Sequence, residues 1–197
     1  MSVTINGSTG VTSPAGTFTD GLTSTTGTFS VGVQVEGVTT NIYPLVSGTA
    51  VAVSGTAVDF TGIPSWATRI TVVFSNVRKS AGASPLIQLI TASGAVTTGY
   101  LCVGSSTSTG VGINSYTTGF GFRATGATDT LSGVFVIAEV NAATNIWSAS
   151  GVLGNTATAN TCATAGTVTL ASALIGIRLT TTSTDTYNQG TVNILYE

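Results

Sequence analysis

The sequence contains no histidine, and this absence removes several classes of chemistry at once. Neither a Ser-His-Asp nor a Cys-His catalytic arrangement can be built without an imidazole. Two cysteines without any histidine cannot fill the tetrahedral shell of a structural zinc ion, and no calcium-loop motif is present. We therefore predict no metal site and no cofactor.

Charged residues are also scarce, at 6% of the chain against roughly 25% in an ordinary soluble domain. The five Lys and Arg residues form no cluster of the kind that neutralises phosphates, so we expect no nucleic-acid binding. The seven carboxylates include no two at motif spacing for glycoside hydrolysis, although folding could bring a pair together. We predict that the protein is not an enzyme and has no catalytic residues.

Long apolar runs are missing as well. No stretch of 18 apolar residues occurs, so no membrane insertion is predicted, and the first ten residues do not have the pattern of a secretory signal. Without such a signal, Cys102 and Cys162 are expected to be reduced, half-buried thiols. A disulfide between them would require an oxidising exterior, and this alternative stays open.

What the sequence does contain is Gly, Ser, Thr and β-branched residues in short runs. The run over residues 69–75 predicts a central strand, with Ile70, Val72 and Phe74 on one face and Trp66 closing the end of the core. Further strands are predicted over residues 86–90, 96–103, 116–122, 131–140, 146–153, 167–170, 174–181 and 191–196. No segment shows a sustained 3.6-residue period. The pattern predicts an all-β protein, with an antiparallel β-sandwich (jelly roll) over residues 46–197.

The segments between these runs are expected to be loops or small hairpins. Residues 76–84 are predicted to form a loop that carries Arg78 and Lys79, either as a solvated tip or, less favoured, as a contact for an acidic sugar or an acidic partner. Residues 104–110 are expected to be an exposed loop. The repeat in residues 46–58 predicts two short strands paired around Ser54 and Gly55.

Residues 1–45 are predicted to be an extended N-terminal attachment arm. The triplet Gly-Thr-Phe occurs twice there, ending at Phe18 and at Phe29. One interpretation is a flexible arm with two accidental matches. The other, which the near absence of charge favours, is an arm whose Phe18 and Phe29 side chains dock onto another chain.

Several motifs occur together from about residue 43 to residue 197. They are PLVSGTA at 44–50, DFTGIPSW at 59–66, RITV at 69–72, QL at 88–89, TTGY at 97–100, SGV at 150–152 and DTYNQGTVNILYE at 185–197. In these motifs the chain resembles the jelly-roll domain of tailed-bacteriophage fibre and other virion surface proteins. The family has no agreed ligand motif, so the resemblance assigns no binding residue and leaves the receptor-binding residues unknown.

The resemblance implies a structural protein of the virion, a homotrimer, made in the host cytoplasm and displayed on the virion surface. Only about forty residues precede the domain, which fits a short spike or decoration protein on head or tail better than a long tail fibre. The arm would bind other virion proteins of the capsid, portal or tail. The sandwich could present its loops to a host surface glycan, and the candidates for stacking on sugar rings are Tyr100, Tyr116, Trp147 and Tyr187. The favoured interpretation of each of these aromatics is a core or interface residue, so none is singled out.

Two hypotheses from other classes remain. The first is a free carbohydrate-binding module that acts without a virion, and monomeric behaviour in solution would support it. The second and weaker is an enzyme such as a glycan depolymerase, which the absence of histidine and the few carboxylates disfavour.

Overall fold

The computed structural model describes residues 32–35, 38–41, 44–107 and 110–197. The chain divides into two compact units, Met1–Ile42 and Tyr43–Glu197. In the first unit, β1 (Gly32–Val35) and β2 (Val38–Asn41) form an antiparallel pair. Phe18 and Phe29, the predicted docking residues of the arm, lie outside the described residues.

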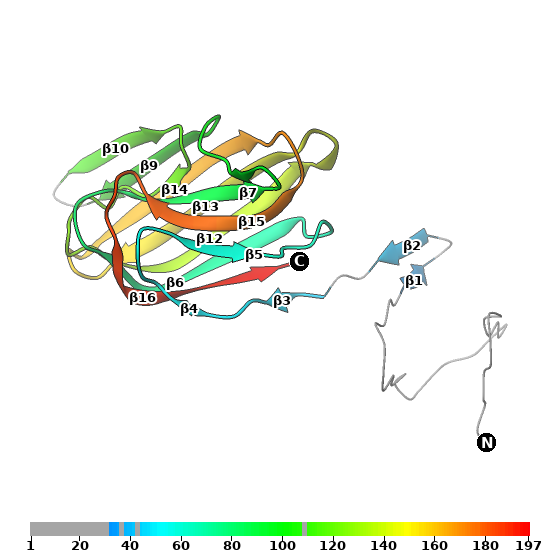
Figure 1. The fold of residues 1–197 in the computed structure, drawn as a ribbon, viewed down its shortest axis with the longest axis horizontal. Coiled ribbons are helices and arrows are strands. Elements are labelled where there is room, and N and C mark those ends of the chain that lie inside the picture. Colours follow the sequence, from blue (N-terminus) through cyan, green and yellow to red (C-terminus); the bar gives the residue numbers. More distant parts are fainter. Residues whose placement is uncertain (1–31, 36–37, 42–43, 108–109) are drawn as a thin grey trace, which may run out of the picture. The chain divides into compact units, whose positions relative to one another are not determined.

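The second unit consists of two antiparallel sheets (Figure 1). The nine-stranded sheet contains β3 (Val46–Ser47), β4 (Val51–Ala52), β6 (Arg69–Lys79), β9 (Leu101–Thr107), β10 (Val111–Tyr116), β12 (Thr130–Asn141), β13 (Ile146–Asn155), β14 (Asn160–Thr169) and β16 (Tyr187–Tyr196). The five-stranded sheet contains β5 (Val58–Thr61), β7 (Pro85–Thr91), β8 (Gly94–Ala95), β11 (Phe120–Gly121) and β15 (Leu174–Thr181). Among the described residues the one helical segment is the single 3₁₀ turn η1 (Ala142–Thr144). The prediction of an all-β antiparallel fold is confirmed.

Strand β6 has the role that its sequence predicts. It lies inside the nine-stranded sheet, between β12 and β16. Ile70 and Val72 are fully buried and Phe74 is nearly so, while Thr71 and Val73 on the other face are only partly covered. This two-residue alternation is what a strand with one face on the core requires.

Aromatic rings from both sheets meet in the core. Phe120 of β11 has its ring centroid 5.9 Å from that of Phe135 in β12 and 5.1 Å from that of Tyr100. Phe122 lies 5.0 Å from Phe135 and 5.7 Å from Phe74 in edge-on arrangements. Such tilted and edge-to-face pairs are the geometries that ring quadrupoles favour. The cluster therefore joins the two sheets.

Residues 141–145, which separate two predicted strands, form the connection of the β12–β13 hairpin. The side-chain oxygen of Asn141 accepts a hydrogen bond from the backbone N–H of Ala143 at 2.9 Å. Asn145 adopts a left-handed conformation with φ of 50°, which asparagine tolerates better than most residues. The two asparagines thus define the start and the end of the turn.

The predicted loop at residues 76–84 is wrong in its first half, because β6 continues to Lys79. Asn76 has a positive φ of 52°, and the pairing of β6 with β16 shifts register near Gly190. These irregularities let the strand bend and continue, with Val77 and Lys79 turned inward and buried. The polar residues among 76–79 favoured a loop, and their sequence alone did not show that β6 continues through them.

The loop predicted at residues 104–110 also fails, and so does the expectation that residues 154–166, between two predicted strands, form a loop. The sequence gives no information on which strands are partners. Residues 104–107 belong to β9, and the small polar residues after position 154 supply the end of β13 and most of β14. In the repeat of residues 46–58, β3 and β4 each pair with β16 and not with each other. Small Ser, Thr, Ala and Gly residues form strands here because a neighbouring strand completes their backbone hydrogen bonds.

Candidate functional site

The four aromatic residues proposed to stack on sugar rings are all in the core. Tyr100, Tyr116, Trp147 and Tyr187 are 1%, 6%, 3% and 2% exposed. The hydroxyl of Tyr100 accepts from the backbone N–H of Leu89 at 2.8 Å, and the hydroxyl of Tyr187 donates to the carbonyl of Thr180. A ring enclosed in this way cannot present a face to a glycan, so the proposal of stacking by these four residues is wrong.

Lys79 is not at a loop tip either. Its side chain is buried, and Nζ donates to the carbonyl oxygen of Gly126 at 2.6 Å. Burial lowers the pKa of Lys79, and the nearby carboxylates of Asp129 and Asp185 partly oppose that shift. Lys79 therefore anchors the loop that contains Gly126, and it is not available to an acidic sugar.

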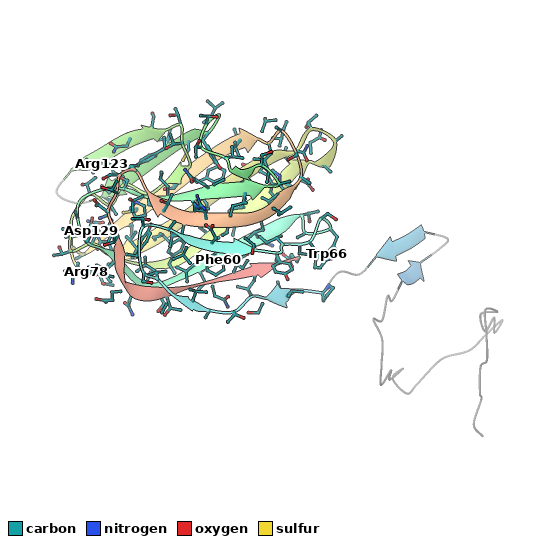
Figure 2. The ribbon with its side chains drawn as sticks, viewed as in Figure 1. Phe60, Trp66, Arg78, Arg123 and Asp129 are labelled. Atoms are coloured by element: carbon teal, nitrogen blue, oxygen red, sulfur yellow. The ribbon has the colours of Figure 1, made fainter. Side chains whose placement is uncertain are left out.

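A polar network surrounds this lysine at one end of the sandwich, where Figure 2 shows Arg78, Arg123 and Asp129. The carboxylate of Asp129 accepts from the backbone N–H of Gly126 and from Nδ2 of Asn155, each at 2.7 Å. Arg123 donates from Nη1 to the hydroxyl of Ser106 at 2.7 Å. Among the described residues Asp129 is the one buried carboxylate. Its oxygens are occupied in holding the loop, so the arrangement is structural.

The two cysteines are free and fully buried, which is deeper than predicted. Cys102 in β9 faces Gly166 in β14, whereas Cys162 faces Ser106, so the two are four positions out of register. Four residues of strand span about 13 Å, well beyond the reach of a disulfide. Burial raises the pKa of the Cys102 thiol and raises that of Cys162 to about 11.

No group of three or more His, Cys, Asp or Glu residues that could hold a metal ion occurs in the described part of the chain. Within the same residues, no helix has the length and apolar character needed to cross a membrane.

The surface that stands out chemically is the outer face of the nine-stranded sheet over β9, β10, β12, β13 and β14, hereafter the outer face. Cross-strand register defines it: Ile113 lies beside Ser105, then Ala163, Val152 and Val134 follow across successive strands. Six of the nine exposed large hydrophobic side chains in the described ranges lie on this face. They are Leu101, Val103, Val111, Ile113, Val134 and Val152.

The outer face also lacks charge. Strands β9, β10, β13 and β14 contain no Asp, Glu, Lys or Arg. Exposed sheet faces are normally polar or charged where they meet water, and gathered apolar side chains mark interaction sites. The chemistry available is van der Waals contact with a few Ser and Thr hydroxyls, which suits binding.

The alternation of residues along β9 shows that its two faces differ, but it does not show which face points away from the core. Leu101 and Val103 point outward, 73% and 50% exposed, while Cys102 and Ser106 point inward. The inward side is the crowded one: a Cβ at Gly104 would lie 2.5 Å from the carbonyl oxygen of Gly121. Only small residues fit there, so the large apolar side chains occupy the outside.

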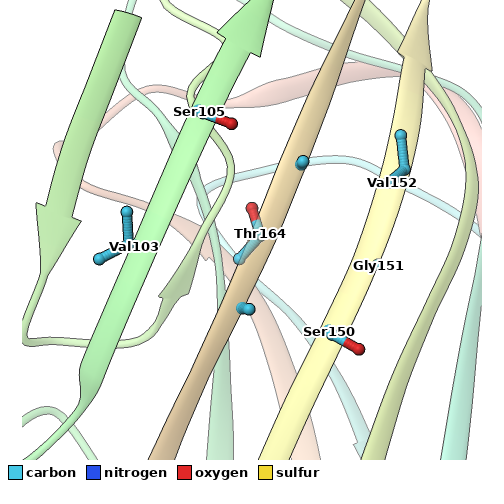
Figure 3. Close-up of a pocket in the computed structure, with 8 residues that line it drawn as sticks. Val103, Ser105, Ser150, Gly151, Val152 and Thr164 are labelled. Carbon is cyan, nitrogen blue, oxygen red and sulfur yellow. The ribbon is translucent and has the colours of Figure 1, made fainter.

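A shallow hollow lies in the middle of the outer face (Figure 3). Val103 and Ser105 of β9 line one side, and Ser150, Gly151 and Val152 of β13 line the other. Between them, β14 contributes Ala163, Thr164 and Ala165 to the floor. The hollow therefore results from small residues on β14 flanked by valines on both neighbouring strands.

Comparison of the chain with protein-family models, curated proteins and solved structures gave no match.

Proposed function

We propose that this protein is a structural component of a bacteriophage virion surface, a short spike or decoration protein with a jelly-roll sandwich. The observation that carries this is the nested strand pairing of the second unit. Moving inward from the two ends, β3 and β4 pair with β16, β5 with β15, β6 with β12, and β7 with β11, all antiparallel.

Such nesting supports a jelly roll, in which a long antiparallel hairpin is folded across two sheets. The first and third pairs lie in the nine-stranded sheet, and the second and fourth lie in the five-stranded sheet. A jelly roll has eight strands. Strands β9, β10, β13 and β14 are additional, and they extend the nine-stranded sheet beyond β12. Together with the motif resemblance, this arrangement favours a virion surface domain.

The proposed mechanism is binding without turnover. The single buried carboxylate in the described residues is held in a loop network, and the hollow on the outer face offers hydroxyl and aliphatic groups only. If the sandwich also binds a host surface glycan, the partly exposed Trp66 and Tyr196 are better placed than the buried tyrosines. Their rings lie 5.8 Å apart at the end of the sandwich where the chain terminates (Figure 2).

Residues 1–45 are proposed to attach the homotrimer to other virion proteins, with Phe18 and Phe29 as apolar contacts. A segment this poor in apolar residues does not offset its ordering entropy, about 1–2 kcal/mol per residue for the backbone, without outside contacts. The sandwich has its own core and should fold without the arm. The free carbohydrate-binding module remains the alternative hypothesis.

Deletion of residues 1–30 tests this proposal. We expect thermal unfolding of the sandwich to stay nearly unchanged while incorporation into phage particles, measured by immunoblot of purified virions, is lost. The double variant Phe18→Ala, Phe29→Ala should show the same loss, and Thr17→Ala, Thr26→Ala serves as a matched control. Normal incorporation of the truncated chain would place the attachment surface on the sandwich and refute the role of the arm.

A further inference from the structure

The outer face has the relief of a ridge beside a groove. Val134 and Val152 are register partners and form one apolar ridge. Val103 and Ile113, diagonal neighbours on β9 and β10, form another on the far side of β14. Between the ridges, Ala163, Ala165 and Ser150 leave the hollow of Figure 3. Ridges and groove of this kind allow one copy of the face to pack into another.

The area of the face is sufficient for a specific contact. At about 4.8 Å between strands and about 3.3 Å per residue, five strands of these lengths present a flat area of about 700 Å². Stable protein interfaces bury about 800 Å² on each partner. The relief of the side chains adds to the flat figure, so this face makes most of one contact. Each copy in a homotrimer has two such contacts, so the second also requires the rim of the sheet at edge strand β10.

Because the outer face carries no charge on four of its strands, an uncharged partner is expected there. An acidic or basic partner would find no complementary group on the four charge-free strands β9, β10, β13 and β14. No aromatic ring is exposed on the face for a sugar to stack on, since Tyr116 and Trp147 point inward. A second copy of the same neutral face brings no like-charge repulsion and buries apolar area on both sides.

We propose that the outer face is the surface through which copies of this chain bind one another. This inference rests on the proposed function, which includes a homotrimer, and assigns its subunit contacts to named strands. Edge strand β10, with Val111 and Ile113 exposed, extends the contact to the rim of the sheet, where unpaired backbone groups can also meet the neighbouring copy.

Charge placed on the face should disrupt self-association. We expect the full-length chain to sediment as a trimer, and Ile113→Lys or Val152→Lys to sediment mainly as monomer at the same concentration. Ile175→Lys is the matched control, because Ile175 is also an exposed aliphatic residue but belongs to the five-stranded sheet. Circular dichroism of each variant checks that the β-fold is kept.

A second measurement does not depend on introducing charge. Ser150→Cys, in the hollow, should react at least about ten-fold more slowly with a maleimide in the trimer than in the chain diluted to monomer. Ile175→Cys should react equally fast in both. The native thiols do not interfere, because Cys102 and Cys162 are 3% and 0% exposed.

The results of these two experiments show whether the assignment of the outer face fails alone or together with the homotrimer. A trimer that survives Ile113→Lys and Val152→Lys, with Ser150→Cys reacting at the same rate in trimer and monomer, overturns the assignment of the face and leaves the trimeric virion protein standing. A parent chain that is monomeric at all concentrations overturns both the inference and the homotrimer. Dissociation by the face variants with the Ile175→Lys trimer intact supports the inference.

Discussion

Alkaline pH should destabilise the sandwich, because several buried groups can ionise only after they reach water. Burial raises the pKa of Cys162 from 9.0 to about 11 and that of Tyr100 from 10.0 to about 12. A group whose pKa is higher in the folded state holds its proton longer there than in the unfolded chain. Its contribution to stability is complete below the unfolded pKa and is lost as pH rises through the folded pKa.

The size of the effect follows from these values. Between pH 7 and pH 11 the linkage relation gives a loss of about 2 kcal/mol from Cys162 and about 1 kcal/mol from Tyr100. Cys102, Tyr116 and Tyr187, whose pKa values are also raised by burial, act in the same direction. Lys79 acts in the opposite direction, because its lowered pKa makes stability rise with pH below 10.5.

Urea unfolding followed by tryptophan fluorescence, with a phosphine reductant present, measures this loss. Cys162→Ser keeps a donor for the carbonyl of Arg123, which Sγ now contacts at 3.2 Å, but removes the thiol that titrates. We expect the loss between pH 7 and pH 11 to be about 2 kcal/mol smaller in this variant. An unfolding free energy that does not change up to pH 11, or a variant that follows the parent at every pH, would refute the reasoning.

Two further predictions concern the core and a glycine at an irregular position within β16. Phe135→Ala removes a fully buried ring that joins both sheets, so urea unfolding should show a loss of about 3–5 kcal/mol, while Val140→Ala, 62% exposed, should change stability by less than about 0.5 kcal/mol. Gly190→Ala should cost at least about 2 kcal/mol, since φ is +98° and a Cβ would lie 2.4 Å from the carbonyl oxygen of Asn76. Gly110→Ala, where a Cβ meets nothing within 4 Å, is the control, and equal stability of the two glycine variants would contradict the prediction.

Residue pattern was sufficient for the strands with one strongly apolar face. Strand β15 has the predicted bounds of 174–181, and β6 and β12 were located from their alternation of apolar residues. The strand segments that were missed, such as most of β14 and the end of β9, are built mainly from Ala, Ser, Thr and Gly. Such residues form strands or loops equally well by type, and what decides is a paired neighbour far away in the sequence.

The candidate site could not be predicted for a related reason. Alternation along a strand shows that two faces differ, but it does not show which face meets the core. In β9 the larger residues Leu101 and Val103 would ordinarily be placed inside. The inner side is closed to them by the approach of β11, where the Gly121 backbone lies against Gly104. That contact joins residues of different sheets and exists only in the folded chain.

The scarcity of charge has a different meaning once the charged residues are placed. Arg178 pairs with Asp59 at 2.7 Å, Arg69 pairs with Glu197 at 2.9 Å, and Lys79 with Asp129 belongs to the buried loop network. None of these groups lies on β9, β10, β13 or β14. Four adjacent strands therefore carry no charged residue at all. In the described part of the chain, the same strands expose most of the large aliphatic side chains that meet solvent. Because both features reduce the cost of removing a surface from water, their coincidence on one face is the strongest physical reason to expect a partner there.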